Sequence, residues 1–270
     1  MSAEREDIFQ SSAGYYTEFR KPYPQRMFDL VRDKFQLDRQ GDLLDVGCGT
    51  GQIALPLSKW FRRVVGVDLS AEMVGYARQN AIEQKIDNAE FHVLAGEDIS
   101  SVAGEFRLVS YGSALHWMDV PKTLAAGNSL LAPGGGVVVL GMRSIWGGET
   151  DWEQTVVRVV QRWMGQGRRA GKGTFDASIL ADVRFEDALS DAGFDVFGAG
   201  VVEARYTVDA DFILGHLYTT SYCNRDLLGD RVGEFEGDMA LELQRLRVDG
   251  ASGTFVWSPG ASYIFGRKRV

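Results

Sequence analysis

The segment that most constrains the fold is a short apolar run followed by an acid and a series of glycines, LLDVGCGTG, from Leu43 to Gly51. The apolar residues predict a buried strand. The glycines at alternate positions predict a turn whose backbone approaches a ligand closely, because glycine has no Cβ. In an open α/β sheet, ligands bind at the carboxyl ends of the strands, where the strand order reverses. The segment therefore predicts a ligand-binding loop after the first strand of such a sheet.

The residues around this loop alternate short apolar runs with longer helical patterns, which is typical of parallel strands joined by crossover helices. We expect strands at Leu43 to Val46, Val64 to Val67, Phe91 to Leu94, Leu108 to Ser110 and Val137 to Leu140. Helices are expected at about Gln52 to Trp60, Ser70 to Gln84 and Pro121 to Leu131. The last of these stops at a proline and three glycines, and the strand after it is apolar throughout, as in a sheet buried on both faces.

The pattern changes after Gly141. A helix is expected at Asp151 to Met164, followed by a loop rich in glycine and basic residues. Further helices are expected at Phe185 to Ala192, Asp209 to Tyr222 and Leu228 to Leu246, and strands at Val201 to Val208 and Ser262 to Arg267. The expected fold is α/β, a Rossmann-like, seven-stranded, mostly parallel sheet with helices on both faces and a helical cap from C-terminal insertions. We interpret residues 1–40 as a helical arm or lid, 41–141 as the ligand-binding core and 142–270 as the rest of one integrated domain.

Composition limits the classes of function. The chain has 270 residues, 45% of them hydrophobic and 24% charged, which is enough for a large core. A formal net charge of −8 opposes a phosphate backbone, so we expect no nucleic-acid partner. Two cysteines are too few for a disulfide framework or a structural zinc site, and no metal is expected. The first ten residues lack a signal-peptide core and no apolar run spans a bilayer, so we expect a cytoplasmic protein without membrane partners, a monomer or homodimer.

An acidic residue follows the next strand at Asp68, about 20 residues beyond the glycine loop. A carboxylate there is suited to accept hydrogen bonds from both hydroxyls of a ribose. Because Gly49, Gly51 and Ala54 also fit the dinucleotide pattern G-x-G-x-x-A, a nicotinamide dehydrogenase is one alternative. Asp45 argues against it, since a carboxylate repels a pyrophosphate and binds a cationic amino group.

Three motifs in this order resemble the class I S-adenosylmethionine (SAM)-dependent methyltransferases. They are DVGCGTG, GVDLSAEMVGYAR and LAPGGGVVVLG, and the resemblance covers roughly Phe9 to Gly141, with a fainter continuation to the C-terminus. It implies SAM as the cofactor and a SAM-binding core at residues 41–141. The resemblance implies that Asp45, Gly47 and Gly49 line the methionine part of SAM and that Asp68 holds its ribose. It also implies that Leu69 and Met73 flank the adenine ring, and that the adenine amine is bordered by Gly96, Glu97 and Asp98.

Two further segments resemble a small-molecule subfamily of these enzymes. AGYY and FRKPYP, before the sheet, are similar to an arm in which a Tyr and an Arg close over the cofactor, which implies roles for Tyr16 and Arg20. Their spacing of four residues places both on one helix face, and the guanidinium would pair with the SAM carboxylate. YGSALHWMD is similar to the SALHW-type segment beside the transferred methyl, which implies that Ser113 and Ala114 lie near the cofactor.

Two histidines are candidate general bases, because a neutral imidazole takes up a proton near physiological pH. His116, in the SALHW-type segment, is the first, and the alternative is that it only shapes the pocket. His216, on a late helix, is the second. Three basic residues of the glycine-rich loop are candidates to attract an acidic acceptor: Arg168, Arg169 and Lys172.

The acceptor itself is predicted only by class. The aromatic residues of the late helices favour a small, partly apolar acceptor, and the resemblance implies the same. We therefore expect SAM-dependent methyl transfer to a small molecule, with O-methylation of a hydroxyl or carboxyl group in secondary metabolism as the leading hypothesis. The alternative is a methyltransferase-fold protein that uses SAM without transferring its methyl group, as a cyclase or a binding protein.

Overall fold

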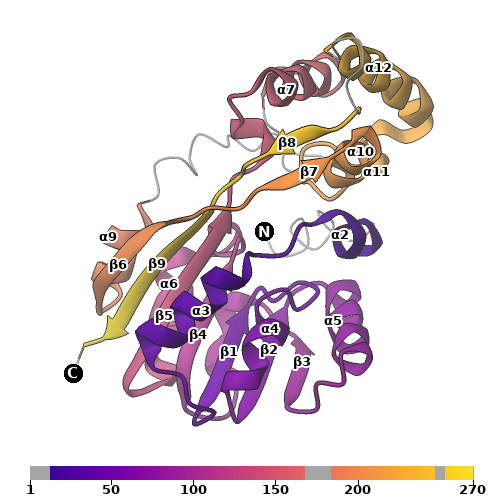
Figure 1. Cartoon of the computed structure of the whole chain (residues 1–270). Coiled ribbons are helices and arrows are strands. Elements are labelled where there is room, and N and C mark those ends of the chain that lie inside the picture. Colours follow the sequence, from indigo (N-terminus) through magenta and orange to yellow (C-terminus); the bar gives the residue numbers. More distant parts are fainter. Residues whose placement is uncertain (1–12, 168–183, 247–252, 270) are drawn as a thin grey trace. The chain divides into compact units, whose positions relative to one another are not determined.

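The computed structural model describes residues 13–167, 184–246 and 253–269, and the chain divides into two compact units (Figure 1). The first, here called the sheet unit, contains Pro22–Met142, Asp182–Val202 and Ala261–Val270. The second, the helical unit, contains Met1–Lys21, Arg143–Ala181 and Glu203–Gly260. The chain therefore passes between the units several times, and each unit is built from segments far apart in sequence.

The sheet unit contains a seven-stranded sheet in the order β3-β2-β1-β4-β5-β9-β6. Its strands are β1 (Asp42–Val46), β2 (Arg63–Asp68), β3 (Ala89–Val93), β4 (Phe106–Gly112), β5 (Leu131–Met142), β6 (Phe194–Val202) and β9 (Ala261–Lys268). Strands β1 to β5 are parallel, whereas β9 runs antiparallel to both of its neighbours, β5 and β6. The predicted fold class, a Rossmann-like and mostly parallel seven-stranded sheet, is confirmed.

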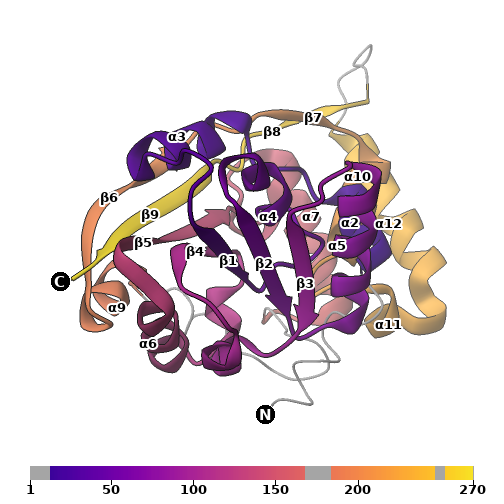
Figure 2. The same cartoon turned by 90° about the horizontal axis from the view of Figure 1, so that it is seen from below.

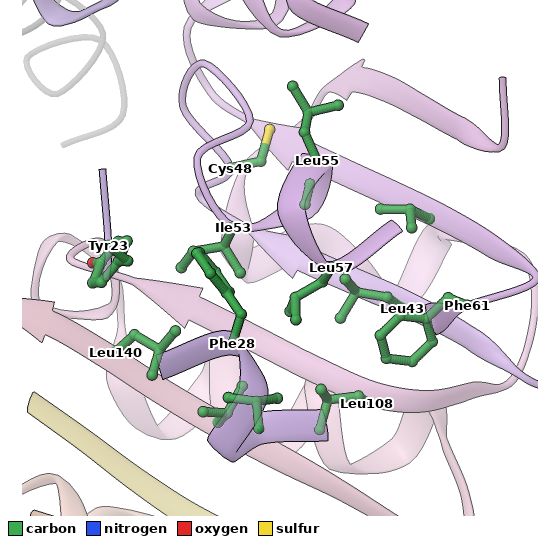
Figure 3. Close-up of a cluster of buried hydrophobic side chains, with 14 of the residues drawn as sticks. Tyr23, Phe28, Leu43, Cys48, Ile53, Leu55, Leu57, Phe61, Leu108 and Leu140 are labelled. Carbon is green, nitrogen blue, oxygen red and sulfur yellow. The ribbon is translucent and has the colours of Figure 1, made fainter. Parts of the chain in front are cut away.

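Both faces of the sheet are covered by helices. Successive residues of a strand point to opposite faces, so neighbouring residues pack against different helices. Leu43 packs into a cluster with α3 (Gln25–Phe35), α4 (Ala54–Leu57) and α5 (Ala71–Glu83), as Figure 3 shows in part. Leu44 packs into the opposite cluster, which includes residues of α6 (Val120–Leu130) and α9 (Phe185–Asp191). The interior strands are therefore apolar on both faces, as their sequences predict.

The sheet reverses its strand order beside β1, which lies between β2 and β4 (Figure 2). The crossover after β1 leads to β2 on one side, whereas the chain later returns to β4 on the other. In open α/β sheets this reversal leaves a crevice at the carboxyl ends of the two strands. The loops that follow β1 and β4 both begin there, so the fold brings the glycine loop and the SALHW-type segment together.

The helical unit is built around an aromatic core. Its elements are α2 (Ala13–Phe19), η4 (Ile145–Gly147), α7 (Asp151–Met164), α10 (Ala210–Tyr218), α11 (Arg225–Leu228), η5 (Gly229–Arg231), α12 (Val232–Arg245) and an antiparallel pair, β7 (Tyr206–Val208) and β8 (Phe255–Trp257). Helix α7 begins with a capping box between Thr150 and Glu153 and is joined to α12 by an ion pair, Arg162 to Asp238, at 2.9 Å. In the described part of the chain, no helix combines the length and apolarity needed to cross a membrane.

Some predicted boundaries are wrong. The predicted strand Val201 to Val208 is two strands in different sheets, because β6 ends at Val202 and β7 begins at Tyr206. Strand β6 lies at the sheet edge, and its partly exposed residues and glycines conceal the alternation that predicts a strand. The short strand β8 was not anticipated, and the predicted helix at Asp209 to Tyr222 ends at Tyr218. Arg168, Arg169 and Lys172 lie outside the described residues.

Candidate active site

The glycine loop after β1 adopts a backbone that favours glycine. Gly47, Gly49 and Gly51 have φ angles of +70°, +52° and +88°. The N–H groups of Gly47 and Cys48 donate to the carbonyl of Val67, at 2.8 and 3.0 Å, which fixes the loop to β2. A Cβ on Gly47 would overlap the Cβ of Ala114. All three glycines therefore allow the backbone conformation, and Gly47 also allows a close approach to the loop after β4.

Asp68, at the end of β2, holds the glycine loop through its carboxylate. One oxygen accepts the N–H of Gly49 at 2.9 Å, and the other accepts the N–H of Ser70 at 2.9 Å. Burial raises the pKa of Asp68, and these two N–H groups lower it. Each oxygen keeps a further lone-pair direction, so the carboxylate can still accept hydrogen bonds from a ligand's hydroxyls.

Asp45 is buried at the end of β1, with 1% of its surface exposed. Its carboxylate accepts hydrogen bonds from the Ser110 hydroxyl at 2.7 Å and from the N–H of Ala54 at 3.1 Å. Burial, with a smaller contribution from the charge of Asp68, raises its pKa to about 7, against the lowering effect of the two hydrogen bonds. Two carboxylates close enough to interact thus border the glycine loop, which favours a cationic ligand.

Ser110 is a site residue that the sequence analysis missed. It is fully buried in β4, a strand that is otherwise apolar at its centre. A hydroxyl in such a strand needs a hydrogen-bond partner, and this requirement was the available signal. The structure gives Asp45 as that partner, so Ser110 is part of the support for the acidic site.

The loop after β4 places the SALHW-type residues beside the glycine loop. Ser113 has a φ of +52°, and its hydroxyl is 3.0 Å from that of Tyr23. Ala114 comes next and packs on Gly47. His116 lies in η3 (Leu115–Trp117), half-buried, with its ring centroid 5.1 Å from that of Trp117. The Met118 side chain, which the sequence analysis did not single out, packs against Gly96. A Cβ on Gly96 would lie only 2.5 Å from the Met118 sulfur.

The residues predicted for the adenine side form two groups. Leu69 is half-buried after β2, and Met73 is buried, its N–H donating to the Ser70 hydroxyl at 3.3 Å. The residues after β3 form η2 (Gly96–Ser101), which faces the start of α6. Glu97 accepts the N–H of Asp119 at 2.9 Å, and Asp98 pairs with Lys122 at 3.5 Å. Both acids therefore have partners within the protein.

Tyr16, Arg20 and His216 belong to the helical unit, whereas the other predicted site residues belong to the sheet unit. The Arg20 guanidinium lies 5.0 Å from the centroid of the Tyr16 ring and donates to the carbonyl of Thr219 at 3.2 Å. His216 is buried, and the charge of Arg20 acts on its imidazole. The arm residues are thus neighbours of one another and of the second candidate base, and their action on the cofactor stays a prediction.

Replacing Asp45 with asparagine is expected to stabilise the protein at neutral pH while weakening cofactor binding. The folded-state pKa of about 7 lies above the ordinary value of 3.8, so wild-type unfolding free energy falls as pH rises between these values. Asparagine carries no charge; its Oδ1 can accept the N–H of Ala54, and its NH2 group can donate to the Ser110 hydroxyl oxygen in place of the bond that the carboxylate accepts. We expect Asp45→Asn to exceed the wild type by about 1–3 kcal/mol above pH 7 and to converge with it near pH 4 in urea unfolding. Equal stabilities at every pH would contradict this.

Comparison with known proteins identifies the class of domain in which these residues lie. Residues 43–135 match the family model of a methyltransferase domain. This range begins at β1 and includes the glycine loop, Asp68, the turn after β3 and the loop after β4. The chain therefore carries a methyltransferase domain, and such a domain implies SAM as the methyl donor.

The curated relatives act, by their names, on different acceptors. The chain is 29% identical over 125 residues to a probable SAM-dependent methyltransferase of Saccharomyces cerevisiae, covering 46% of this chain and 43% of that protein. It is 32% identical to the nocamycin O-methyltransferase of Saccharothrix syringae, covering 50% and 49%. It is 33% identical to a tRNA (uracil-5-)-methyltransferase homolog of Mus musculus, covering 42% and 18%. The chain thus aligns with half or less of each of these proteins.

The expectation that nucleic-acid partners are excluded is wrong. Relatives named as tRNA and rRNA uracil methyltransferases align with this chain, among them the mouse protein and an rRNA enzyme of Pasteurella multocida at 35% identity. Net charge misled here because it averages over the whole surface, whereas binding to a phosphate backbone depends on a local basic patch.

Solved structures share the fold. The magnesium protoporphyrin IX methyltransferase of Synechocystis, with bound S-adenosylhomocysteine, superposes with a TM-score of 0.53 at 15% identity over 99% of both chains. The [4+2]-cyclase SpnF superposes with a TM-score of 0.55 at 20% identity, covering 98% of this chain and 93% of that one. Identities this low establish the fold alone.

Proposed function

We propose that this protein transfers the methyl group of SAM to a hydroxyl or carboxyl group of a small acceptor. The observation that carries the cofactor assignment is the pair of carboxylates, Asp45 and Asp68, that border the glycine loop and interact with each other. SAM bears a sulfonium and an ammonium, which two carboxylates attract, whereas the pyrophosphate of a dinucleotide would be repelled. The same observation disfavours the dehydrogenase alternative.

The residues present fit SAM. In this proposal Gly47 and Gly49, whose φ angles are positive, line the methionine part, and Asp45 binds its ammonium. Asp68 offers its remaining lone pairs to the ribose hydroxyls, with Leu69 and Met73 beside the adenine and Gly96, Glu97 and Asp98 at its amine. In this proposal Ser113 and Ala114 border the methyl-bearing end, and the roles of Tyr16 and Arg20 rest on the sequence resemblance alone.

SAM supplies an already activated methyl group, so the protein needs mainly to align the acceptor and exclude water. In this proposal His116 takes the proton of the acceptor hydroxyl, because it lies on the loop after β4, next to the residues that contact Gly47. His216 is the second candidate from the sequence, but burial and the charge of Arg20 lower its pKa to about 3, which makes it a weak base at neutral pH. A fold shared with a cyclase keeps open the alternative in which SAM is bound but not consumed.

The acceptor class is tested by incubating the protein with SAM labelled on its methyl group, in separate reactions with hydroxylated and carboxylated metabolites, with total tRNA and with rRNA. The nocamycin enzyme supports a small acceptor, because its alignment covers 50% of this chain and 49% of that enzyme. The alignment with the mouse tRNA enzyme covers only 18% of that enzyme. Label in the metabolite fraction is expected. Label in RNA alone would overturn the proposed acceptor, and product formation without SAM consumption would favour the cyclase alternative.

His116→Ala is expected to lower turnover by about 10²- to 10⁴-fold, the usual contribution of a general base, while leaving S-adenosylhomocysteine affinity within about threefold. His92→Ala is the matched control, because His92 is an exposed residue of β3 and lies outside the proposed site. The measurement is kcat across pH 5 to 9, with binding determined by calorimetry. If His116→Ala and His92→Ala have the same turnover over the whole range, His116 is not the base.

A further inference from the structure

Two polar ring atoms lie buried in the aromatic core of the helical unit. His216, on α10, and Trp257, at the end of β8, are each 2% exposed, and their ring centroids are 4.9 Å apart. Nε2 of His216 and Nε1 of Trp257 have no hydrogen-bond partner among the described residues. Buried polar atoms nearly always have a partner, so this pair calls for one that the described residues do not provide.

The hydrogen bond on the other side of the His216 ring defines which ring nitrogen carries the proton. Nδ1 lies 3.2 Å from the carbonyl oxygen of Phe19, which can only accept, so Nδ1 carries the proton. Burial and the charges of Arg20 and Lys21 lower the pKa of His216 to about 3. The imidazole is therefore neutral at physiological pH, and Nε2 is a bare acceptor.

Trp257 provides the complementary group. An indole Nε1–H only donates, so the pair presents one acceptor and one donor. With ring centroids 4.9 Å apart, the two rings are near enough for one oxygen to form hydrogen bonds of about 3 Å with both. A hydroxyl is the group that meets both needs with one atom, since it donates its proton to Nε2 and accepts from Nε1–H.

We propose that His216 and Trp257 form a subsite that binds a phenolic hydroxyl group of the acceptor, here called the hydroxyl subsite. This inference rests on the proposed function and adds the substrate class. Aromatic rings surround the subsite: the centroid of Phe212 is 5.7 Å from that of His216, and that of Tyr206 is 6.0 Å from that of Trp257. These surroundings suit an aromatic framework.

The charges near the subsite favour a phenol over an alkyl alcohol. The Lys21 ammonium lies 4.3 Å from the centroid of Phe212, and Arg20 and Lys21 both act electrostatically on His216. Nearby cations stabilise the partial negative charge on the oxygen of a donating hydroxyl, and a phenol is the more acidic donor. Lys21, Phe19 and Tyr206, which neighbour the subsite, are half-buried, whereas His216 and Trp257 are each 2% exposed.

The test compares 4-propylphenol with 4-propylanisole, which has the same framework but lacks the hydroxyl proton. Binding is followed by the indole ¹H–¹⁵N resonances of the six tryptophans, with Trp257→Phe identifying the Trp257 signal. We expect the phenol to shift that signal and to bind roughly tenfold or more tightly than the anisole. His216→Phe keeps an aromatic ring but has no acceptor nitrogen, so this variant should bind the phenol and the anisole about equally.

Equal binding of the two probes by the wild type, or an unchanged Trp257 signal, would overturn the subsite even if His216→Phe fails to fold. Titration of the same wild-type sample with S-adenosylhomocysteine separates this outcome from failure of the proposed function. Binding of S-adenosylhomocysteine without a phenol preference refutes the hydroxyl subsite alone. A phenol preference without S-adenosylhomocysteine binding supports the subsite and contradicts the cofactor site.

Discussion

Replacing Asp68 with alanine is expected to weaken S-adenosylhomocysteine binding by about 100-fold or more. The substitution removes the proposed ribose acceptor and also the partner of two backbone N–H groups, those of Gly49 and Ser70. Loss of hydrogen bonds to a charged group costs roughly 1.5–3 kcal/mol each, and 1.4 kcal/mol corresponds to a factor of ten in affinity. Isothermal titration calorimetry of the variant and the wild type measures the difference.

Asp87→Ala is the matched control for this experiment. Asp87 is an exposed aspartate of the same unit, between α5 and β3, and its substitution should leave the affinity unchanged. Thermal unfolding of both variants separates lost binding from lost structure. If Asp68→Ala is folded and binds as tightly as Asp87→Ala, Asp68 does not hold the ribose and the cofactor site is elsewhere.

The second large effect is expected at Gly47. An alanine there would keep a φ of +70°, which costs about 1–2 kcal/mol for a residue with a Cβ. Its Cβ would also overlap that of Ala114, and overpacking typically costs a further 1–3 kcal/mol. We expect Gly47→Ala to lower the free energy of unfolding by about 2–5 kcal/mol and to abolish measurable S-adenosylhomocysteine binding, because relief of the overlap displaces the loop.

Gly75→Ala provides the comparison for Gly47→Ala. Gly75 lies within α5 and is exposed, and no atom lies within 4 Å of the position that a Cβ would take, so alanine should stabilise the helix by about 0.5–1 kcal/mol. Urea unfolding monitored by circular dichroism measures both variants. A Gly47→Ala protein as stable as the wild type would show that the loop after β1 does not need glycine at this position.

The position in the fold of the residues proposed to bind the cofactor was largely predictable, because these residues follow strands in sequence. Asp45 is the last residue but one of β1 and Asp68 is the last of β2, and the carboxyl ends of parallel strands meet at one edge of the sheet. Ser110 and Met118 were not predicted. Their importance comes from contacts with Asp45 and with Gly47 and Gly96, which are distant in sequence and which periodicity does not encode.

The later part of the chain was harder to predict for a physical reason. Interior strands such as β5 are apolar on both faces, whereas β6 is an edge strand with exposed positions, and its pattern is weak. The segment after it leaves the sheet unit, contributes β7, α10 and α12 to the helical unit, and returns as β9. Because the helical unit is assembled from three separate segments, pairs such as His216 and Trp257 emerge only in the folded structure.

The central claim is that the glycine loop and its two carboxylates bind SAM. The most direct measurement is calorimetric titration of the wild-type protein with S-adenosylhomocysteine, with NAD titrated in parallel under the same conditions. The proposed site predicts one-to-one binding of S-adenosylhomocysteine with a Kd in the micromolar range, about −8 kcal/mol, and no binding of NAD. Binding of NAD without binding of S-adenosylhomocysteine would contradict the claim and restore the dehydrogenase alternative.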